Sequence, residues 1–131
     1  MSAMAQPPTV LFADDEPSIR KLFAATLEGS GIHLLEAADG VQALALAHEA
    51  RPQLVVLDIA MPGMDGIEVC RALKADDRTR HIPVWILSAY ARAGEDRLRD
   101  APADARIEKP FSPLALRTRI EQALRSSIGG A

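Results

Sequence analysis

Polar side chains suited to phosphoryl chemistry follow four of the apolar runs in this 131-residue sequence. They are Asp14 and Asp15 after the first run, and Asp58, Ser88 and Lys109 after three later ones. Carboxylates that are brought together repel one another, so they need a nearby cation to stay ionised. Mg²⁺ accepts one or two protein carboxylates and readily takes a phosphate oxygen. An aspartate beside such a cation can attack a phosphoryl group and hold it as an acyl phosphate.

Asp58 is the candidate for the attacking carboxylate because it ends a fully apolar run. Residues 54–57 read Leu-Val-Val-Leu, which predicts a strand covered on both faces. Phosphoryl transfer requires mostly positioning and charge neutralisation. Lys109 can supply a compact positive charge on a long stem, and the Ser88 hydroxyl can contact another phosphoryl oxygen.

Strands and helices that alternate along the chain are expected to position these groups. The predicted strands are residues 9–13, 32–37, 54–57, 84–87 and 105–107, with a helix after each of them. This order predicts a parallel sheet with helices on both faces. Ligands of such sheets bind outside the carboxyl ends of the strands, so the polar side chains that follow the strands should converge at one edge.

Helical periodicity predicts which side chains face the core. The expected inward residues are Ile19, Leu22, Phe23 and Leu27 in the first helix, Val41, Leu44 and Ala45 in the second, Ile67, Cys70 and Leu73 in the third, and Leu116, Ile120, Ala123 and Leu124 in the last. The fourth helix, at 91–103, offers one large apolar residue, Leu98. We therefore expect it to be the least firmly held of the five.

The composition is that of an ordinary soluble domain, with 48% hydrophobic and 25% charged residues and a net charge of −3. Basic residues are scattered, so no direct nucleic-acid partner is expected. No apolar stretch approaches the roughly 18 residues that span a bilayer, and the start does not resemble a secretory signal. The single cysteine suits a reducing cytoplasm. We expect a disordered lead-in at 1–8, one domain at 9–125 and a short tail at 126–131.

Four motifs together resemble the receiver domain of bacterial two-component response regulators. They are Asp14-Asp15-Glu16, Asp58-Ile-Ala-Met-Pro-Gly-Met-Asp-Gly, Leu87-Ser88-Ala89 and Lys109-Pro110-Phe111, and the likeness covers roughly residues 8–125. It implies a flavodoxin-like (βα)5 fold, an α/β doubly wound five-stranded parallel sheet with strand order 2-1-3-4-5. It also implies phosphorelay signalling, in which a histidine kinase or phosphotransfer protein donates a phosphoryl group. The modified domain then signals to a downstream protein through the fourth helix, the fifth strand and the fifth helix.

The resemblance assigns roles to individual residues. Asp58 would be the phospho-acceptor. The ligands of Mg²⁺, or of Mn²⁺ in its place, would be the carboxylates of Asp14, Asp15 and Asp58 and the main-chain carbonyl of Ala60. The remaining roles fall to Ser88, which would shift toward the phosphoryl group, to Lys109, which would pair with it, and to Pro110, which would follow a cis peptide bond.

One position departs from the family pattern. Arg106 stands three residues before the lysine, where the family usually has an aromatic residue that swings inward with the hydroxyl residue. An arginine cannot bury its guanidinium there without a partner, so the usual coupling to Ser88 is in question. Tyr90, two residues after Ser88, is a candidate to take part in switching or to shield the phosphoryl group from water.

Two other functions compete with this interpretation. An enzyme acting on free phosphoesters through an aspartyl-phosphate would be expected to carry Asp-x-Asp after a strand, and this chain does not. A receiver-like adaptor that binds partners without phosphorylation would be expected to lose an acid or the lysine. Taken singly, Asp14 and Asp15 could be helix caps and Lys109 a solvated charge. Their combined spacing favours a phosphorylated signalling module, which is not an enzyme with a separate substrate.

Overall fold

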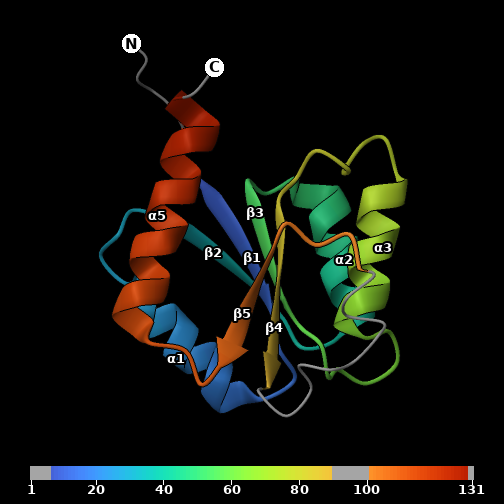
Figure 1. Ribbon diagram of the computed structural model, residues 1–131, viewed down its shortest axis with the longest axis horizontal. Helices are drawn as coiled ribbons and strands as arrows, with labels where there is room; N and C mark the ends of the chain where they lie inside the picture. Colours follow the sequence, from blue (N-terminus) through green and yellow to red (C-terminus); the bar gives the residue numbers. More distant parts are fainter. Residues whose placement is uncertain (1–6, 90–100, 130–131) are drawn as a thin grey trace.

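A five-stranded parallel sheet forms the centre of the molecule, which we describe from a computed structural model over residues 7–89 and 101–129 (Figure 1). The strands are β1 (Thr9–Ala13), β2 (His33–Ala37), β3 (Leu54–Asp58), β4 (Val84–Ala89) and β5 (Ala105–Lys109). Their order in the sheet is β2-β1-β3-β4-β5. All four neighbouring pairs are parallel. The predicted strand order and sheet type are therefore confirmed.

Helices cover both faces of this sheet. The described helices are α1 (Pro17–Leu27), α2 (Gly40–Ala50), α3 (Gly66–Ala75) and α5 (Pro113–Gly129). Figure 1 shows α1 and α5 on one face and α2 and α3 on the other. This arrangement is the doubly wound flavodoxin-like fold that the sequence predicts. Most of the expected fourth helix lies outside the described residues, and residues 101–103 of it are not helical.

The sheet separates two apolar cores because successive strand side chains point to opposite faces. In β1, Val10 and Phe12 belong to the core on the α1 and α5 side. Leu11 and Ala13, which alternate with them, belong to the core on the α2 and α3 side. The Phe12 ring stacks on Phe23 of α1 with centroids 3.9 Å apart. Every residue of the central strand β3 is buried, as expected for a strand covered on both faces.

The inward face predicted for α2 is wrong. Val41 is 66% exposed, Ala45 is also exposed, and Leu44 is only partly buried. The buried face instead consists of the small residues Gly40, Ala43 and Ala47. A Cβ at Gly40 would lie 1.8 Å from the Met64 carbonyl oxygen, so the start of α2 lies against the loop before α3. Close packing explains why small side chains, and not the larger Val41, face inward.

Two smaller predictions at the ends of the chain also need correction. On α1, Phe23 and Leu27 are buried as expected, but Leu22 is 41% exposed because it lies beside that apolar stripe. A short tail was predicted to begin at Ser126, but α5 continues through this position to Gly129. Serines do not break a helix as glycine does, so the first strong stop is the Gly129-Gly130 pair. None of the helices in the described ranges is both long and apolar enough to cross a membrane.

The start of α3, which follows the loop after β3, is fixed by a capping box. The Asp65 carboxylate accepts the Glu68 N–H at 2.9 Å, and the Glu68 carboxylate accepts the Asp65 N–H at 2.9 Å. We expect Asp65→Ala to lower the free energy of unfolding by about 1 kcal/mol, the usual loss for an N-cap. Urea titration would measure this. Asp77→Ala removes a highly exposed carboxylate and serves as control, with an expected change below about 0.5 kcal/mol.

Candidate phosphoryl-acceptor site

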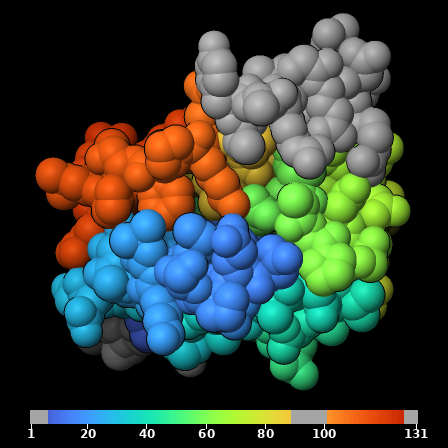
Figure 2. Space-filling view, turned by 90° about the horizontal axis from the view of Figure 1, so that it is seen from below, coloured from blue at the N-terminus to red at the C-terminus, as the bar shows by residue number. Residues whose placement is uncertain are grey.

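The predicted polar residues meet at the carboxyl ends of the strands. Figure 2 views this end of the molecule, where the segments after β1, β3 and β5 lie next to one another. A pocket of about 280 Å³ opens there and is lined by Asp15, Glu16, Asp58, Ile59, Ala60, Ser88 and Lys109. The parallel sheet thus brings together side chains that are far apart in the sequence, as its topology requires.

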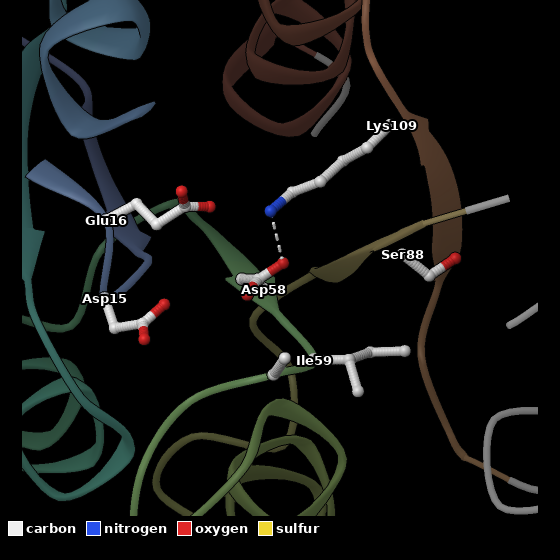
Figure 3. A pocket seen from close by; sticks show the side chains of 7 residues that line it. Asp15, Glu16, Asp58, Ile59, Ser88 and Lys109 are labelled. Carbon is white, nitrogen blue, oxygen red and sulfur yellow. Dashed lines mark ion pairs between the residues drawn. The ribbon is translucent and has the colours of Figure 1, made fainter. Parts of the chain in front are cut away.

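The Lys109 ammonium lies between two buried carboxylates. Its Nζ is 2.6 Å from Asp58 Oδ1, an ion pair drawn in Figure 3, and 3.1 Å from Asp14 Oδ2. The Asp14 side chain is fully buried, that of Asp58 is 8% exposed, and that of Lys109 is 20% exposed. One positive charge therefore compensates two acids that have little access to water.

The electrostatics of this group follow from burial and pairing. Burial and the nearby charge of Asp14 raise the pKa of Asp58, although the hydrogen bond from Lys109 opposes them. For Lys109, burial alone would lower the pKa, but the hydrogen bonds and charges of Asp58 and Asp14 outweigh it and raise the pKa. The site therefore keeps Lys109 charged while it resists the ionisation of Asp58, which leaves the site short of positive charge.

The carboxylates fit a hard divalent cation. Asp14, Asp15 and Asp58 each offer an oxygen within 4.8 Å of the others. Asp15 is exposed, whereas Asp14 and Asp58 are buried, so the group is accessible from one side. Ala60 lines the same pocket two residues after Asp58. Carboxylate and carbonyl oxygens suit Mg²⁺ or Mn²⁺ more than softer metals.

Backbone contacts hold Asp58 in place from the next strand and the next helix. The Ile59 N–H donates to the Leu87 carbonyl at 3.1 Å, and the Gly66 N–H donates to the Ile59 carbonyl at 3.0 Å. A Cβ at Gly66 would lie 2.3 Å from the Asp58 carbonyl oxygen. The first residue of α3 must therefore be glycine for the helix to approach the end of β3 this closely.

The residues expected to take part in switching are placed differently from one another. Ser88 is buried at the end of β4, and Figure 3 shows its hydroxyl turned away from Lys109 Nζ. Arg106 is exposed on β5, so its side chain does not point inward as the family's aromatic residue at this position is expected to do. The Lys109–Pro110 peptide bond is cis. Tyr90 lies outside the described residues.

Three residues near the site were given no role in it by the sequence analysis, although Glu16 belongs to one of the quoted motifs. Glu16 and Ile59 line the pocket, and each directly follows a predicted site residue, a signal that could have found them. Arg20 donates from Nη1 to the main-chain carbonyl of Asp14 at 2.8 Å. Its position on a helix, among other polar residues, gave no sign of that contact.

Known proteins share both this sequence pattern and this structure. The response regulator receiver domain family matches residues 10–121. The polar-differentiation response regulator DivK of Brucella anthropi is 38% identical over 126 residues, which are 95% of this chain and 99% of DivK. The chemotaxis response regulator CheY4 of Vibrio cholerae superposes with a TM-score of 0.79 at 30% identity, covering 88% of this chain and 98% of that structure.

A third structure is the receiver domain of the sensor histidine kinase PA1611 from Pseudomonas aeruginosa. It superposes with a TM-score of 0.78 at 28% identity, covering 93% of this chain and 98% of that domain. The family match spans most of the chain, and DivK matches nearly end to end. With the sheet order and the convergent acids, these comparisons establish that the chain belongs to the receiver domain family of response regulators.

Proposed function

We propose that this receiver domain accepts a phosphoryl group on Asp58 from a histidine kinase or a histidine phosphotransfer protein. The observation that carries the proposal is the 2.6 Å contact between Lys109 Nζ and Asp58 Oδ1 beside Asp14 and Asp15. A carboxylate oxygen of Asp58 attacks phosphorus and forms a P–O bond while the P–N bond to the donor histidine breaks. The electron pair of that bond stays on the donor nitrogen, which takes a proton from water.

The residues around Asp58 have separate tasks in this transfer. Lys109 neutralises an oxygen of the incoming group, since its ammonium already lies beside the acceptor. Asp14, Asp15, Asp58 and the Ala60 carbonyl would hold Mg²⁺, or Mn²⁺ in its place. A bound cation supplies positive charge that offsets the phosphoryl oxygens. The PA1611 receiver domain supports this assignment, because its structure is described with a magnesium ion coordinated in the active site cleft.

Switching follows once the phosphoryl group is in place. We propose that the Ser88 hydroxyl, now turned away from Lys109, rotates toward a phosphoryl oxygen. Such a contact exists only in the modified form, so it shifts the equilibrium between two conformations. The downstream protein would bind the face formed by the fourth helix, β5 and α5. Because Arg106 is exposed on β5, it would contact that partner directly. Any role of Tyr90 in switching would depend on the movement of Ser88.

The alternative of an unphosphorylated adaptor has less support, since the acids and the lysine of the site all converge. A cytoplasmic location is part of the proposal, and the free, buried Cys70 is consistent with a reducing compartment.

Intact mass after incubation with acetyl phosphate and Mg²⁺ tests the function. We expect one added phosphoryl group in the wild type and none in Asp58→Asn or in the presence of EDTA. Asp65→Asn, which changes a nearby carboxylate outside the pocket, should still gain the group. A wild-type mass that never changes with acetyl phosphate, phosphoramidate or a phosphorylated kinase would refute the proposal, and so would modification that persists in Asp58→Asn.

A further inference from the structure

The guanidinium of Arg20 connects the residue that follows β1, Asp14, to the edge strand β2. Its Nη1 donates to the main-chain carbonyl of Asp14 at 2.8 Å. Its Nε lies 3.6 Å from Glu36 Oε1 on β2. The side chain of Arg20 is 21% exposed, so it is largely enclosed between α1 and β2. A planar guanidinium with several donors can hold two acceptors at once, which an ammonium on a flexible stem does less well.

Asp14 is held from every side, and Arg20 supplies one of its four restraints. Its N–H donates to the Ala37 carbonyl at 3.1 Å. Its Oδ1 accepts the Glu16 N–H at 3.0 Å, and its Oδ2 accepts the Lys109 ammonium at 3.1 Å. The contact from Arg20 to the Asp14 carbonyl completes the set. That carbonyl belongs to the peptide unit that leads into Asp15, so fixing it fixes the direction in which Asp15 leaves the strand.

We propose that Arg20 is a positioning residue for the divalent-cation site. Through the Asp14–Asp15 peptide unit it sets the separation of the two carboxylates, and Glu36 holds the guanidinium in the orientation that makes this contact. Arg20 does not touch the cation or the phosphoryl group. This inference rests on the proposed function for its meaning, although its main measurement needs no phosphorylation.

The direction in which Mg²⁺ affinity changes when Arg20 is removed distinguishes a positioning role from an effect of its charge alone. Arg20 is a cation near a cation site, so its charge alone weakens Mg²⁺ binding and its removal would tighten binding. If positioning dominates, removal weakens binding instead. Residues that orient metal ligands typically change affinity by about 10- to 100-fold when they are lost. We expect Arg20→Met, which keeps an apolar stem, to raise the Mg²⁺ dissociation constant roughly tenfold.

Isothermal titration calorimetry with MgCl₂ and no phosphodonor measures this dissociation constant. Lys21→Met is the matched control, because it removes the same charge from an exposed neighbour on α1. We expect the control to stay within about twofold of wild type, since exposed charges are screened by salt. Arg20→Lys retains the positive charge without the planar guanidinium, so its Mg²⁺ dissociation constant should fall between those of wild type and Arg20→Met. An Arg20→Met dissociation constant equal to or below that of Lys21→Met would overturn the inference.

A second variant keeps the test decisive if Arg20→Met does not fold. Glu36→Gln leaves Arg20 intact but weakens its restraint, so Mg²⁺ binding should weaken by a smaller factor. An unchanged dissociation constant in Glu36→Gln would overturn the role of Glu36 and with it the proposed arrangement. The double variant should bind Mg²⁺ no more weakly than Arg20→Met alone, because both changes act on one contact.

The rate of phosphorylation by acetyl phosphate provides a readout that a merely structural role would not move. In Arg20→Met the rate should be low at limiting Mg²⁺ and should return to the wild-type rate at saturating Mg²⁺. A rate that stays low at saturation would mean that Asp58 itself is misplaced, which contradicts the inference. Mg²⁺ binding without any phosphorylation of wild type would refute the proposed function alone. Phosphorylation together with an unchanged dissociation constant in Arg20→Met would refute this inference alone.

Discussion

Lys109→Met should lower the free energy of unfolding by about 3 kcal/mol at pH 7 in EDTA, because it leaves buried charges without their partner. The ammonium lies 2.6 Å from Asp58 Oδ1 and 3.1 Å from Asp14 Oδ2, and both acids are nearly inaccessible to water. Methionine retains the length of the side chain, so the loss reflects charge more than packing. Guanidinium titration monitored by circular dichroism would measure it.

The pH dependence of this loss has a definite sign. Burial raises the pKa of Asp58, and the variant removes the hydrogen bond and charge from Lys109 that oppose this rise. An acid whose pKa is raised in the folded state destabilises that state as the pH increases from its ordinary pKa through the folded one. Because the pKa of Lys109 is raised, its ammonium is fully charged at neutral pH and its contribution to the free energy of unfolding is complete there. The stability gap between wild type and Lys109→Met should therefore narrow as the pH is lowered toward about 4.

The control for Lys109→Met is Lys21→Met, which removes an exposed ammonium and should change stability by less than about 0.5 kcal/mol. Mg²⁺ should restore part of the lost stability in Lys109→Met, because a bound cation would replace the missing positive charge. Equal stability of Lys109→Met and wild type at pH 7 would contradict the view that Lys109 compensates the buried acids.

The strands could be predicted because each strand carries its own signal, whereas their order in the sheet was expected only from the resemblance to receiver domains. Residues 54–57 are apolar without interruption, and this is enough to place a strand at the centre of the sheet. The parallel order then fixes the common edge, so Asp14, Asp58 and Lys109 could be expected near one another before any distance was known. The convergence of Asp14, Asp58 and Lys109, which depends only on the sheet topology, can therefore be predicted from the sequence.

Helix orientation was harder to predict, and α2 shows why. Its sequence is apolar at most positions from Val41 to Ala47, so periodicity alone allows several faces to point inward. The close approach of the chain around Met64 selects the face with Gly40, and Val41 is left exposed. Such a choice depends on contacts between segments distant in sequence. The Arg20 contact with the Asp14 carbonyl and the outward hydroxyl of Ser88 are hidden for the same reason.

Gly66→Ala should lower both the stability and the proposed phosphorylation rate, because this glycine allows α3 to begin directly against the end of β3. An added Cβ would lie 2.3 Å from the Asp58 carbonyl oxygen and 3.1 Å from the Ile59 Cα. Both neighbours are backbone atoms of buried residues, so relief requires moving the strand end or the helix. We expect a loss of about 3 kcal/mol in the free energy of unfolding, at the upper end of overpacking effects.

The functional consequence follows from the same displacement. In the proposed transfer, Asp58 must lie in line with the donor phosphorus, and a shift of about 1 Å in a reacting group can cost roughly hundredfold in rate. We therefore expect acetyl phosphate to modify Gly66→Ala about a hundred times more slowly than wild type at saturating Mg²⁺. Initial rates from intact mass, taken at a temperature where the variant is folded, would separate this effect from unfolding.

Gly63→Ala provides the matched control on the same loop. Gly63 has φ +73°, so alanine there is strained by about 1 kcal/mol, but its Cβ would meet no heavy atom within 4 Å. We expect Gly63→Ala to lose stability with little change in phosphorylation rate. If Gly66→Ala lost stability but was modified at the wild-type rate, the contact between α3 and the end of β3 would be structural only. A loss of rate confined to Gly66→Ala would show that this contact holds the acceptor in its reactive position.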